Sequence, residues 1–319
     1  VTPDDAWFAT AADALPEDAA DSVLIGRVWD PAAGGPSPVV VRDGVLLDVS
    51  DRFPTVHDLC ELPDPAAVVA NLDGTPLADL AEVLSNTGAA DRDRTRPWLL
   101  APVDLQALKA AGVTFAVSMI ERVIEERARG DLALATDIRR RMLAEIGDDF
   151  HDLTPGSDEA ARLKELLLAE GAWSQYLEVG IGPDAEIFTK GQILSAVGTA
   201  VPVGVLEALG NDVNLRDIEG RSALLLPMAK DNNASCALGP FIRLFDDHFG
   251  LHDVRALTVA LDIRCEDGFV LDAVSEMSRM SRDPEALVRQ LLGRHHHYPD
   301  GAALMLGTMF APIHDRDRP

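Results

Sequence analysis

The second half of the chain is a succession of short apolar runs with few helices between them, and this pattern constrains the fold most strongly. Strands are predicted at 185–190, 209–214, 241–245, 256–264, 269–274 and 302–307, and a helix at 284–292. Parallel strands need crossover helices, and the intervals between these runs leave little room for them. The pattern therefore predicts a mostly antiparallel, β-rich C-terminal domain within an α+β fold.

The first part of the chain has the pattern of a smaller α/β unit. Strands are predicted at 22–29, 38–42 and 44–49, with a hairpin signal at Asp43-Gly44, and helices around 56–62 and 77–84. The polar tract 86–96, followed by Pro97, is typical of an interdomain linker. Because 319 residues exceed the usual size of a single core, we expect a small N-terminal domain at 1–97 and a larger domain at 98–319.

Helical and strand patterns are mixed in the segment that follows the linker. Asp104 can cap a short helix, residues 112–117 can form a strand, and helices are predicted at 119–129, 132–146 and 158–170. Most charged side chains of these helices fit a solvated surface stabilised by pairs four residues apart. One or two of their glutamates could still face a pocket.

Composition excludes several classes of partner. The formal net charge of −25, from 28 basic and 53 acidic residues, argues against nucleic-acid binding, which depends on clustered Lys and Arg. The three cysteines have no paired spacing, so neither a disulfide framework nor a zinc knuckle is indicated. No apolar run reaches the roughly 18 residues that span a bilayer, and the N-terminal residues are acidic. We therefore expect a cytoplasmic protein that contacts neither nucleic acid nor a membrane.

Polar residues of distinct chemical types interrupt the apolar pattern between Leu209 and Pro240. Asp212 ends a strand and, if Val213 faces the core, faces a cleft, where a carboxylate can hold magnesium or calcium or simply form a turn. Arg216 can bind a substrate carboxylate or pair with a nearby acid, and Asp217 can cap a short helix that runs to residues 223–226. Lys230 is by default a solvent lysine in a polar loop; buried, it could act as a base.

Two further candidates have ordinary alternatives. Lys190 ends an apolar strand, where a charged terminus is common. Gly307 and Thr308 end a strand and could offer a backbone N–H and a hydroxyl to a carboxylate, or form a simple turn. The histidines 295–297 are adjacent in a loop and do not converge on one ion, so we expect them on the surface. The sequence contains no glycine-rich phosphate loop and no nucleophile elbow.

Several segments together resemble the fumarylacetoacetate hydrolase family, and within it the branch of 2-keto-3-deoxy-pentonate dehydratases. The resemblance lies in DLQALKAAGVTFAVSMIERVIEERARGD (104–131), WSQYLEVGIGPDAEIFTKG (173–191), LGNDVNLRDIEGRSALLL (209–226), AKDNNASCALGPFIRLFD (229–246), SRDP (281–284) and YPDGAALMLGTMFAP (298–312). These segments span most of the chain. The set is much more specific than any single motif.

The resemblance implies a β-rich catalytic domain of the family type at 98–319, a smaller N-terminal domain and a homo-oligomer, either a dimer or a tetramer. It implies one magnesium ion, with manganese or calcium as alternatives, held by Asp212 and by two glutamates of a Glu-x-Glu motif. It assigns Lys230 as the catalytic lysine, Glu125 or Glu126 as the acid/base glutamate and Thr308 as a contact of the substrate carboxylate. Gly307, Lys190 and Arg216 are the further substrate-binding candidates.

The chain departs from the family between Thr199 and Leu209. Family members carry a longer segment there, with both glutamate ligands, whereas this sequence has only AVPVGVLEA, in which Glu207 cannot replace both. Relatives also continue past the position of Pro319 through a Gly-Phe-Thr-His segment and two strands. We expect that residues of the natural protein are missing from this sequence, because deleting strands from a barrel-like sheet would expose its edges. The alternative is a true deletion that has lost the metal.

The expected activity is magnesium-dependent dehydration of a small anionic 2-keto acid. By the resemblance, a 2-keto-3-deoxy-pentonate, the xylonate or the arabinonate, gives 2,5-dioxopentanoate in pentose catabolism. Hydrolysis of a carbon–carbon bond in an acylpyruvate is an alternative, but it usually needs a histidine, and TFAVSMIE at 114–121 has none. A catalytically dead family member is a second alternative if the deletion is real.

Overall fold

An antiparallel sheet near the N-terminus gathers strands from three parts of the chain. The computed structural model describes residues 14–88, 92–128, 134, 136–138, 140, 153–169, 171, 173–198, 209–219, 221–264 and 268–310. The sheet has the order β11-β1-β2-β3-β4, and β5 pairs with β1. Its strands are β1 (Leu24–Asp30), β2 (Gly35–Arg42), β3 (Val45–Asp48), β4 (Thr75–Asp79), β5 (Trp98–Leu99) and β11 (Ile242–Arg243).

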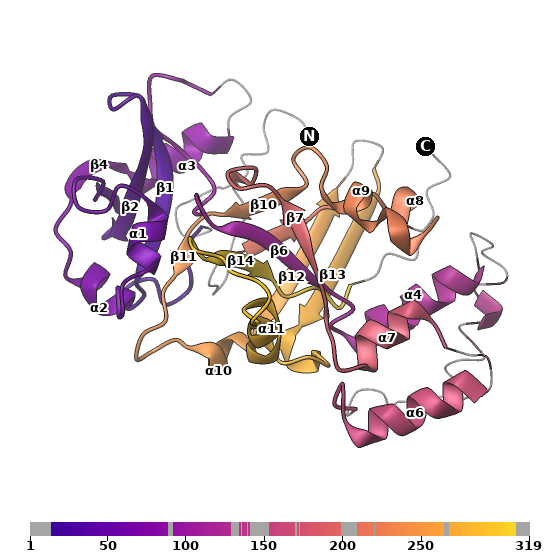
Figure 1. Ribbon diagram of the computed structural model, residues 1–319. Coiled ribbons are helices and arrows are strands. Elements are labelled where there is room, and N and C mark those ends of the chain that lie inside the picture. The colour runs from indigo at the N-terminus through magenta and orange to yellow at the C-terminus, as the bar shows by residue number, and fades with distance from the viewer. Residues whose placement is uncertain are drawn as a thin grey trace.

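Alternating side chains of this sheet form a core on each of its faces. Leu24 and Val39 pack with helix α3 (Leu80–Gly88) on one face. On the other face, Ile25 and Val40 pack with α1 (Val56–Cys60) and α2 (Pro65–Ala70). Burying apolar side chains on both faces stabilises this sheet, whereas an isolated hairpin of the same strands would be only marginally stable in water. Figure 1 shows this α/β unit at one end of the molecule.

The predicted hairpin at Asp43-Gly44 is confirmed. Arg42 pairs with Val45, so the turn between β2 and β3 has two residues. Both adopt positive φ, 49° at Asp43 and 77° at Gly44. A two-residue turn of this kind needs positive φ at both positions, which Asp and Gly tolerate better than most residues. The turn sets the register of the two strands.

The predicted linker at 86–96 does not run free of the N-terminal sheet. The side-chain amide of buried Asn86 donates to the carbonyls of Asp93, Arg96 and Pro97, at 2.9, 3.2 and 3.0 Å. The chain then continues into β5, which pairs with β1. Strands from both sides of the expected boundary thus share one sheet, and the division at residue 97 stays a prediction.

Asp104 caps a helix, but not the one expected to follow it. Its buried carboxylate accepts the backbone N–H of Val56 at 2.7 Å and of His57 at 3.1 Å, at the start of α1. The residues after it form strand β6 (Ala107–Gly112) instead of a helix. The strand expected at 112–117 is also wrong, because Val113 has φ 54° and helix α4 (Ala116–Ala128) follows.

Three small sheets make the middle of the molecule. One has the order β14-β6-β7, the second β8-β10-β9, and the third is the antiparallel pair β12-β13. In addition to β6, these sheets contain β7 (Glu186–Gly191), β8 (Val197–Gly198), β9 (Leu209–Asp212), β10 (Cys236–Gly239), β12 (Thr258–Arg264), β13 (Val270–Glu276) and β14 (Ala302–Met305). Most pairs are antiparallel as predicted, whereas β14–β6 and β10–β8 are parallel.

Helices cluster at the end opposite the N-terminal sheet (Figure 1). α4 packs with α6 (Asp158–Ala169) and α7 (Gln175–Ile181) around buried apolar side chains such as Met119 and Leu177. The remaining helices include α10 (Leu251–Val254), α11 (Pro284–Leu291) and the short turn Met277–Arg279. The helix predicted at 132–146 lies largely outside the described residues. No helix in the described part of the chain is long and apolar enough to cross a membrane.

Candidate active site

A strand and two short helices carry the candidate catalytic and binding side chains of the 209–240 stretch. Asp212 ends β9, opposite Cys236 of β10. The chain then forms α8 (Arg216–Glu219), a turn of 3₁₀-helix at Ala223–Leu225 and α9 (Leu226–Lys230). Asp217 lies within α8, so it does not cap a helix as expected. Lys230 closes α9 instead of opening a loop.

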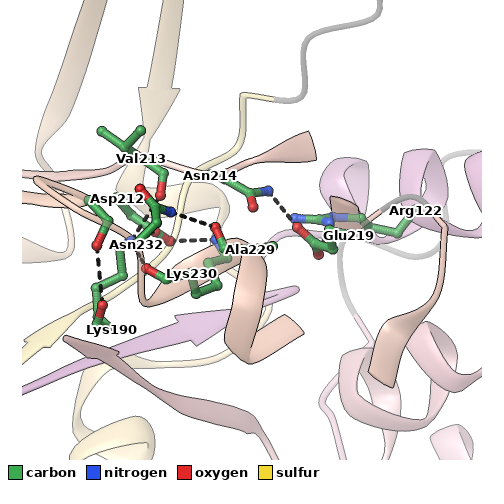
Figure 2. A network of polar contacts seen from close by, with 10 residues as sticks. Arg122, Lys190, Asp212, Val213, Asn214, Glu219, Ala229, Lys230 and Asn232 are labelled. Atoms are coloured by element: carbon green, nitrogen blue, oxygen red, sulfur yellow. Dashed lines mark hydrogen bonds and ion pairs between the residues drawn. The ribbon is translucent and has the colours of Figure 1, made fainter. Parts of the chain in front are cut away.

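Lys190, Asp212 and Lys230 form one ion-pair cluster, named here the lysine–aspartate cluster (Figure 2). The Nζ atom of Lys190 lies 3.2 Å from Oδ1 of Asp212. The Nζ atom of Lys230 donates a hydrogen bond to Oδ2 of Asp212 at 2.8 Å. Val213 is exposed, so it does not face the core as the sequence argument supposed, while Asp212 turns toward the two lysines. One carboxylate therefore bridges two ammonium groups.

Both lysines are buried, although the sequence alone suggests an ordinary strand end for Lys190 and a solvent-exposed position for Lys230. The side chain of Lys190 is 0% exposed and that of Lys230 is 7% exposed. Lys190 also donates to the backbone carbonyls of Val213 at 2.8 Å and of Lys230 at 2.6 Å. Burial lowers the pKa of Lys190, while neighbouring Asp212 opposes that shift. Local sequence could not reveal this, because a lysine at a strand end is usually exposed.

Strand β7 presents a face toward this cluster that the sequence argument did not single out. Glu186, Phe188 and Lys190 alternate along β7 and therefore share one face. The ring of Phe188 lies 5.1 Å from Nζ of Lys230. Burial raises the pKa of Glu186, against the opposing charge of Arg122. The alternation of Glu, Phe and Lys is the sequence signal that could have found this face.

A second network joins helix α4 to α8 beside the cluster (Figure 2). Glu219 is buried, pairs with Arg122 of α4 and accepts a hydrogen bond from the side-chain amide of Asn214. Its charge also bears on Glu186, whose pKa it raises. The network thus holds α8 against α4, and it places the Glu219 carboxylate within electrostatic reach of Glu186.

The described residues do not fit a magnesium site. No group of three or more His, Cys, Asp or Glu side chains among them could hold a metal ion. Asp212 supplies one carboxylate, and both of its oxygens face lysine ammonium groups. Magnesium requires near-octahedral oxygen ligands, and two ammonium groups at the same carboxylate repel a dication. Residues 199–208, where the family carries its glutamate ligands, lie outside the described residues.

Thr308 and Gly307, the substrate-binding candidates at the C-terminal side, have described contacts with β13 and with Thr114. Thr308 Oγ1 lies 2.7 Å from the hydroxyl of Ser275 on β13. Gly307 has φ 90°, and a Cβ there would lie 2.2 Å from Oγ1 of Thr114. The contacts described for these two residues do not include the lysine–aspartate cluster. The histidines 295–297 are exposed, as predicted.

The remaining candidates cannot be placed against the cluster. Glu125 and Glu126 belong to helix α4 and Arg216 begins α8, but their side chains lie outside the described residues. The residues that the structure does bring together are Lys190, Asp212 and Lys230, with Glu186 and Phe188 beside them. This arrangement offers ammonium groups for an anionic oxygen and a buried carboxyl group that can carry a proton.

Comparison with known proteins agrees with the resemblance found in the sequence. No protein-family model matches the chain. The relatives that the comparison finds are nevertheless in line with the predicted resemblance to the fumarylacetoacetate hydrolase family. A relative from Haloferax volcanii, a probable 2-keto-3-deoxyxylonate dehydratase, is 26% identical over 276 residues, which cover 85% of this chain and 84% of the relative.

Solved structures show the same α+β fold. A 2-keto-3-deoxy-D-arabinonate dehydratase complexed with magnesium and 2,5-dioxopentanoate superposes with a TM-score of 0.57 at 17% identity, covering 91% of this chain and 89% of that chain. The apo form of such a dehydratase gives a TM-score of 0.55 at 18% identity with the same coverage. At these identities the likeness concerns the fold.

Proposed function

We propose that this protein is a hydro-lyase that dehydrates a 2-keto-3-deoxy-pentonate, the xylonate or the arabinonate, to 2,5-dioxopentanoate. The observation that carries the proposal is the buried lysine–aspartate cluster, with Glu186 beside it, in a fold shared with proteins named as dehydratases of such acids. A 2-keto acid is a small anion, and buried ammonium groups attract its carboxylate and polarise its keto oxygen.

The two lysines of the cluster have different roles: one holds the site together and the other can bind substrate. Lys190 donates hydrogen bonds to two backbone carbonyls and forms an ion pair with Asp212, so it fixes the site. Lys230 has one described hydrogen bond, to Asp212, and can donate its other N–H groups to substrate oxygens. Phe188 covers the Lys230 ammonium with its ring, which keeps water away from that side.

Loss of water requires removal of a proton from C3 and departure of the C4 hydroxyl with a second proton, and the resulting 3-ene then tautomerises through its C5 enol to 2,5-dioxopentanoate. Taking the C3 proton places negative charge on the C2 oxygen, where an ammonium group stabilises it. We assign the C3 proton to Lys230 acting as a neutral amine, which becomes an ammonium group paired with Asp212 when it takes that proton. We assign protonation of the leaving hydroxyl to Glu186, because its raised pKa favours the protonated form.

Glu125 or Glu126, the acid/base glutamate that the family resemblance implies, remains the alternative to Lys230 for removing the C3 proton. Magnesium accompanies the product in one related structure. No step above passes through a metal, because the described residues do not supply its ligands.

The proposal is tested by product analysis. The protein is incubated with a panel of 2-keto-3-deoxy sugar acids and acylpyruvates, with and without Mg²⁺, and products are identified by NMR. We expect 2,5-dioxopentanoate from a 2-keto-3-deoxy-pentonate, and loss of turnover by about a hundredfold or more in Lys230→Ala. Circular dichroism checks that the variant is folded. Unchanged turnover in this variant would remove the lysine from the mechanism.

A non-catalytic family member is a second candidate, and one observation favours it. The described residues provide no cluster of three metal-binding side chains, whereas a related dehydratase structure contains magnesium. If no compound of the panel is converted under any metal condition, the site serves binding alone. Cleavage of an acylpyruvate would instead assign the protein to the carbon–carbon hydrolases.

A further inference from the structure

The carboxylate of Asp212 is already neutralised by this chain's own side chains. Lys190 and Lys230 approach different oxygens of Asp212, at 3.2 and 2.8 Å. Lys190 cannot turn to solvent, because its side chain is 0% exposed and its ammonium also bonds two backbone carbonyls. Removing Asp212 from this pairing would leave a buried cation without its counter-ion, which is strongly unfavourable.

The charges of the described side chains around the cluster are balanced as well. Arg122, Glu219, Lys230 and Asp212 act electrostatically on Glu186, and Lys190 pairs with Asp212, so three carboxylates accompany three cations among these side chains. Their formal charges sum to zero when all are ionised. A divalent cation would add two uncompensated positive charges in a partly buried place, whereas a carboxylate adds one negative charge beside two ammonium groups.

We infer that Asp212 in this chain is the counter-ion that positions Lys190 and Lys230 and not a metal ligand, and that the cluster binds a small 2-keto acid without a divalent cation. The inference rests on the proposed function for the class of ligand. Lys230 supplies the contact, since it has one described hydrogen bond and the other donors of an ammonium group remain for ligand oxygens.

The sign of one substitution separates a counter-ion from a metal ligand. In Asp212→Asn the two ammonium groups lose their negative partner, so affinity for an anion should rise. We expect pyruvate, a minimal 2-keto acid, to bind about tenfold more tightly to this variant in EDTA, measured by titration calorimetry. If Asp212 instead held a metal that binds the ligand, the same substitution would abolish pyruvate binding.

Asp231→Asn is the matched control. It makes the same change of charge one residue beyond Lys230, at an exposed position outside the cluster. We expect its affinity for pyruvate to stay within about twofold of wild type, because an exposed charge is screened by solvent. An equal gain in both variants would show a general effect of net charge and would overturn the assignment of Asp212.

Wild-type protein provides a test that does not depend on a variant's folding. Titration with MgCl₂ alone should give no saturable heat, and pyruvate should bind equally in EDTA and in excess Mg²⁺. Saturable Mg²⁺ binding, or pyruvate binding that requires Mg²⁺, would overturn the inference while leaving the dehydratase proposal intact. Metal-free pyruvate binding without turnover of any sugar acid would support the inference and count against the proposed reaction.

Discussion

The ammonium group of Lys190 donates a hydrogen bond of 2.6 Å to the backbone carbonyl of Lys230, so the end of strand β7 is fastened to the end of helix α9. The same ammonium group reaches Val213 O and Asp212, which follow one another at the end of β9. One buried side chain therefore ties three elements together. Its removal should affect stability before it affects chemistry.

Lys190→Met should lower the free energy of unfolding by about 3 kcal/mol, because two buried carbonyls lose their common donor and the Asp212 carboxylate loses one of its cations. Methionine keeps a similar length without the charge. Urea unfolding followed by circular dichroism measures the change. Lys109→Met is the control, since Lys109 pairs with exposed Thr189 on the adjacent strand and should lose about 0.5 kcal/mol or less. Similar losses for both variants would contradict the structural role of Lys190.

Asp104→Ala should destabilise the protein through helix α1, although the two lie far apart in sequence. The buried carboxylate accepts two N–H groups at the start of α1, and buried donors left without partners cost about 1–3 kcal/mol. Thermal and urea unfolding measure the loss. Asp64→Ala, which removes an exposed cap from α2, should cost about 1 kcal/mol. A smaller effect at Asp104 than at Asp64 would contradict this assignment.

Glu186 should make stability decrease with rising pH. Burial raises the pKa of this carboxyl in the folded state above its ordinary value of 4.5, so the folded protein holds the proton more tightly than the unfolded chain. Raising the pH above 4.5 therefore favours unfolding, until the group is ionised in both states. The isosteric Glu186→Gln variant lacks the titrating carboxyl group and therefore this contribution to the pH dependence of stability. The difference in unfolding free energy, wild type minus variant, should fall as pH rises, and a flat difference would refute the prediction.

Gly112→Ala should displace Glu186 without unfolding the protein. A Cβ at this glycine would lie 1.8 Å from Oε2 of Glu186, the mobile end of a side chain. We expect turnover of the 2-keto acid to fall about tenfold or more, if Glu186 is the general acid. Gly35→Ala is the control, because nothing lies within 4 Å of its added methyl group. Equal turnover in the two variants would argue against Glu186.

Much of the fold could be predicted from local patterns. Strands β1 to β3, the Asp43-Gly44 turn and the helix starting at Pro284 are encoded by alternation, turn residues and a cap within a few positions. The predictions that failed depended on distant partners. Asp104 is a residue type that often caps the helix after it, but here it caps α1. The segment after it forms a strand that pairs with β7 and β14.

The sequence by itself determined the strands and helices whose signals are local, such as β1 to β3 and the helix at Pro284, and it placed Asp212 and Lys230 in one stretch of interest. The tertiary structure alone decided that Lys190 joins them, that both lysines are buried and that Glu186 lies nearby with a raised pKa. The physical reason is that periodicity reports contacts between near neighbours in the chain, whereas burial and ion pairing depend on which strands lie side by side. A lysine at the end of a strand is ordinary until another strand covers it.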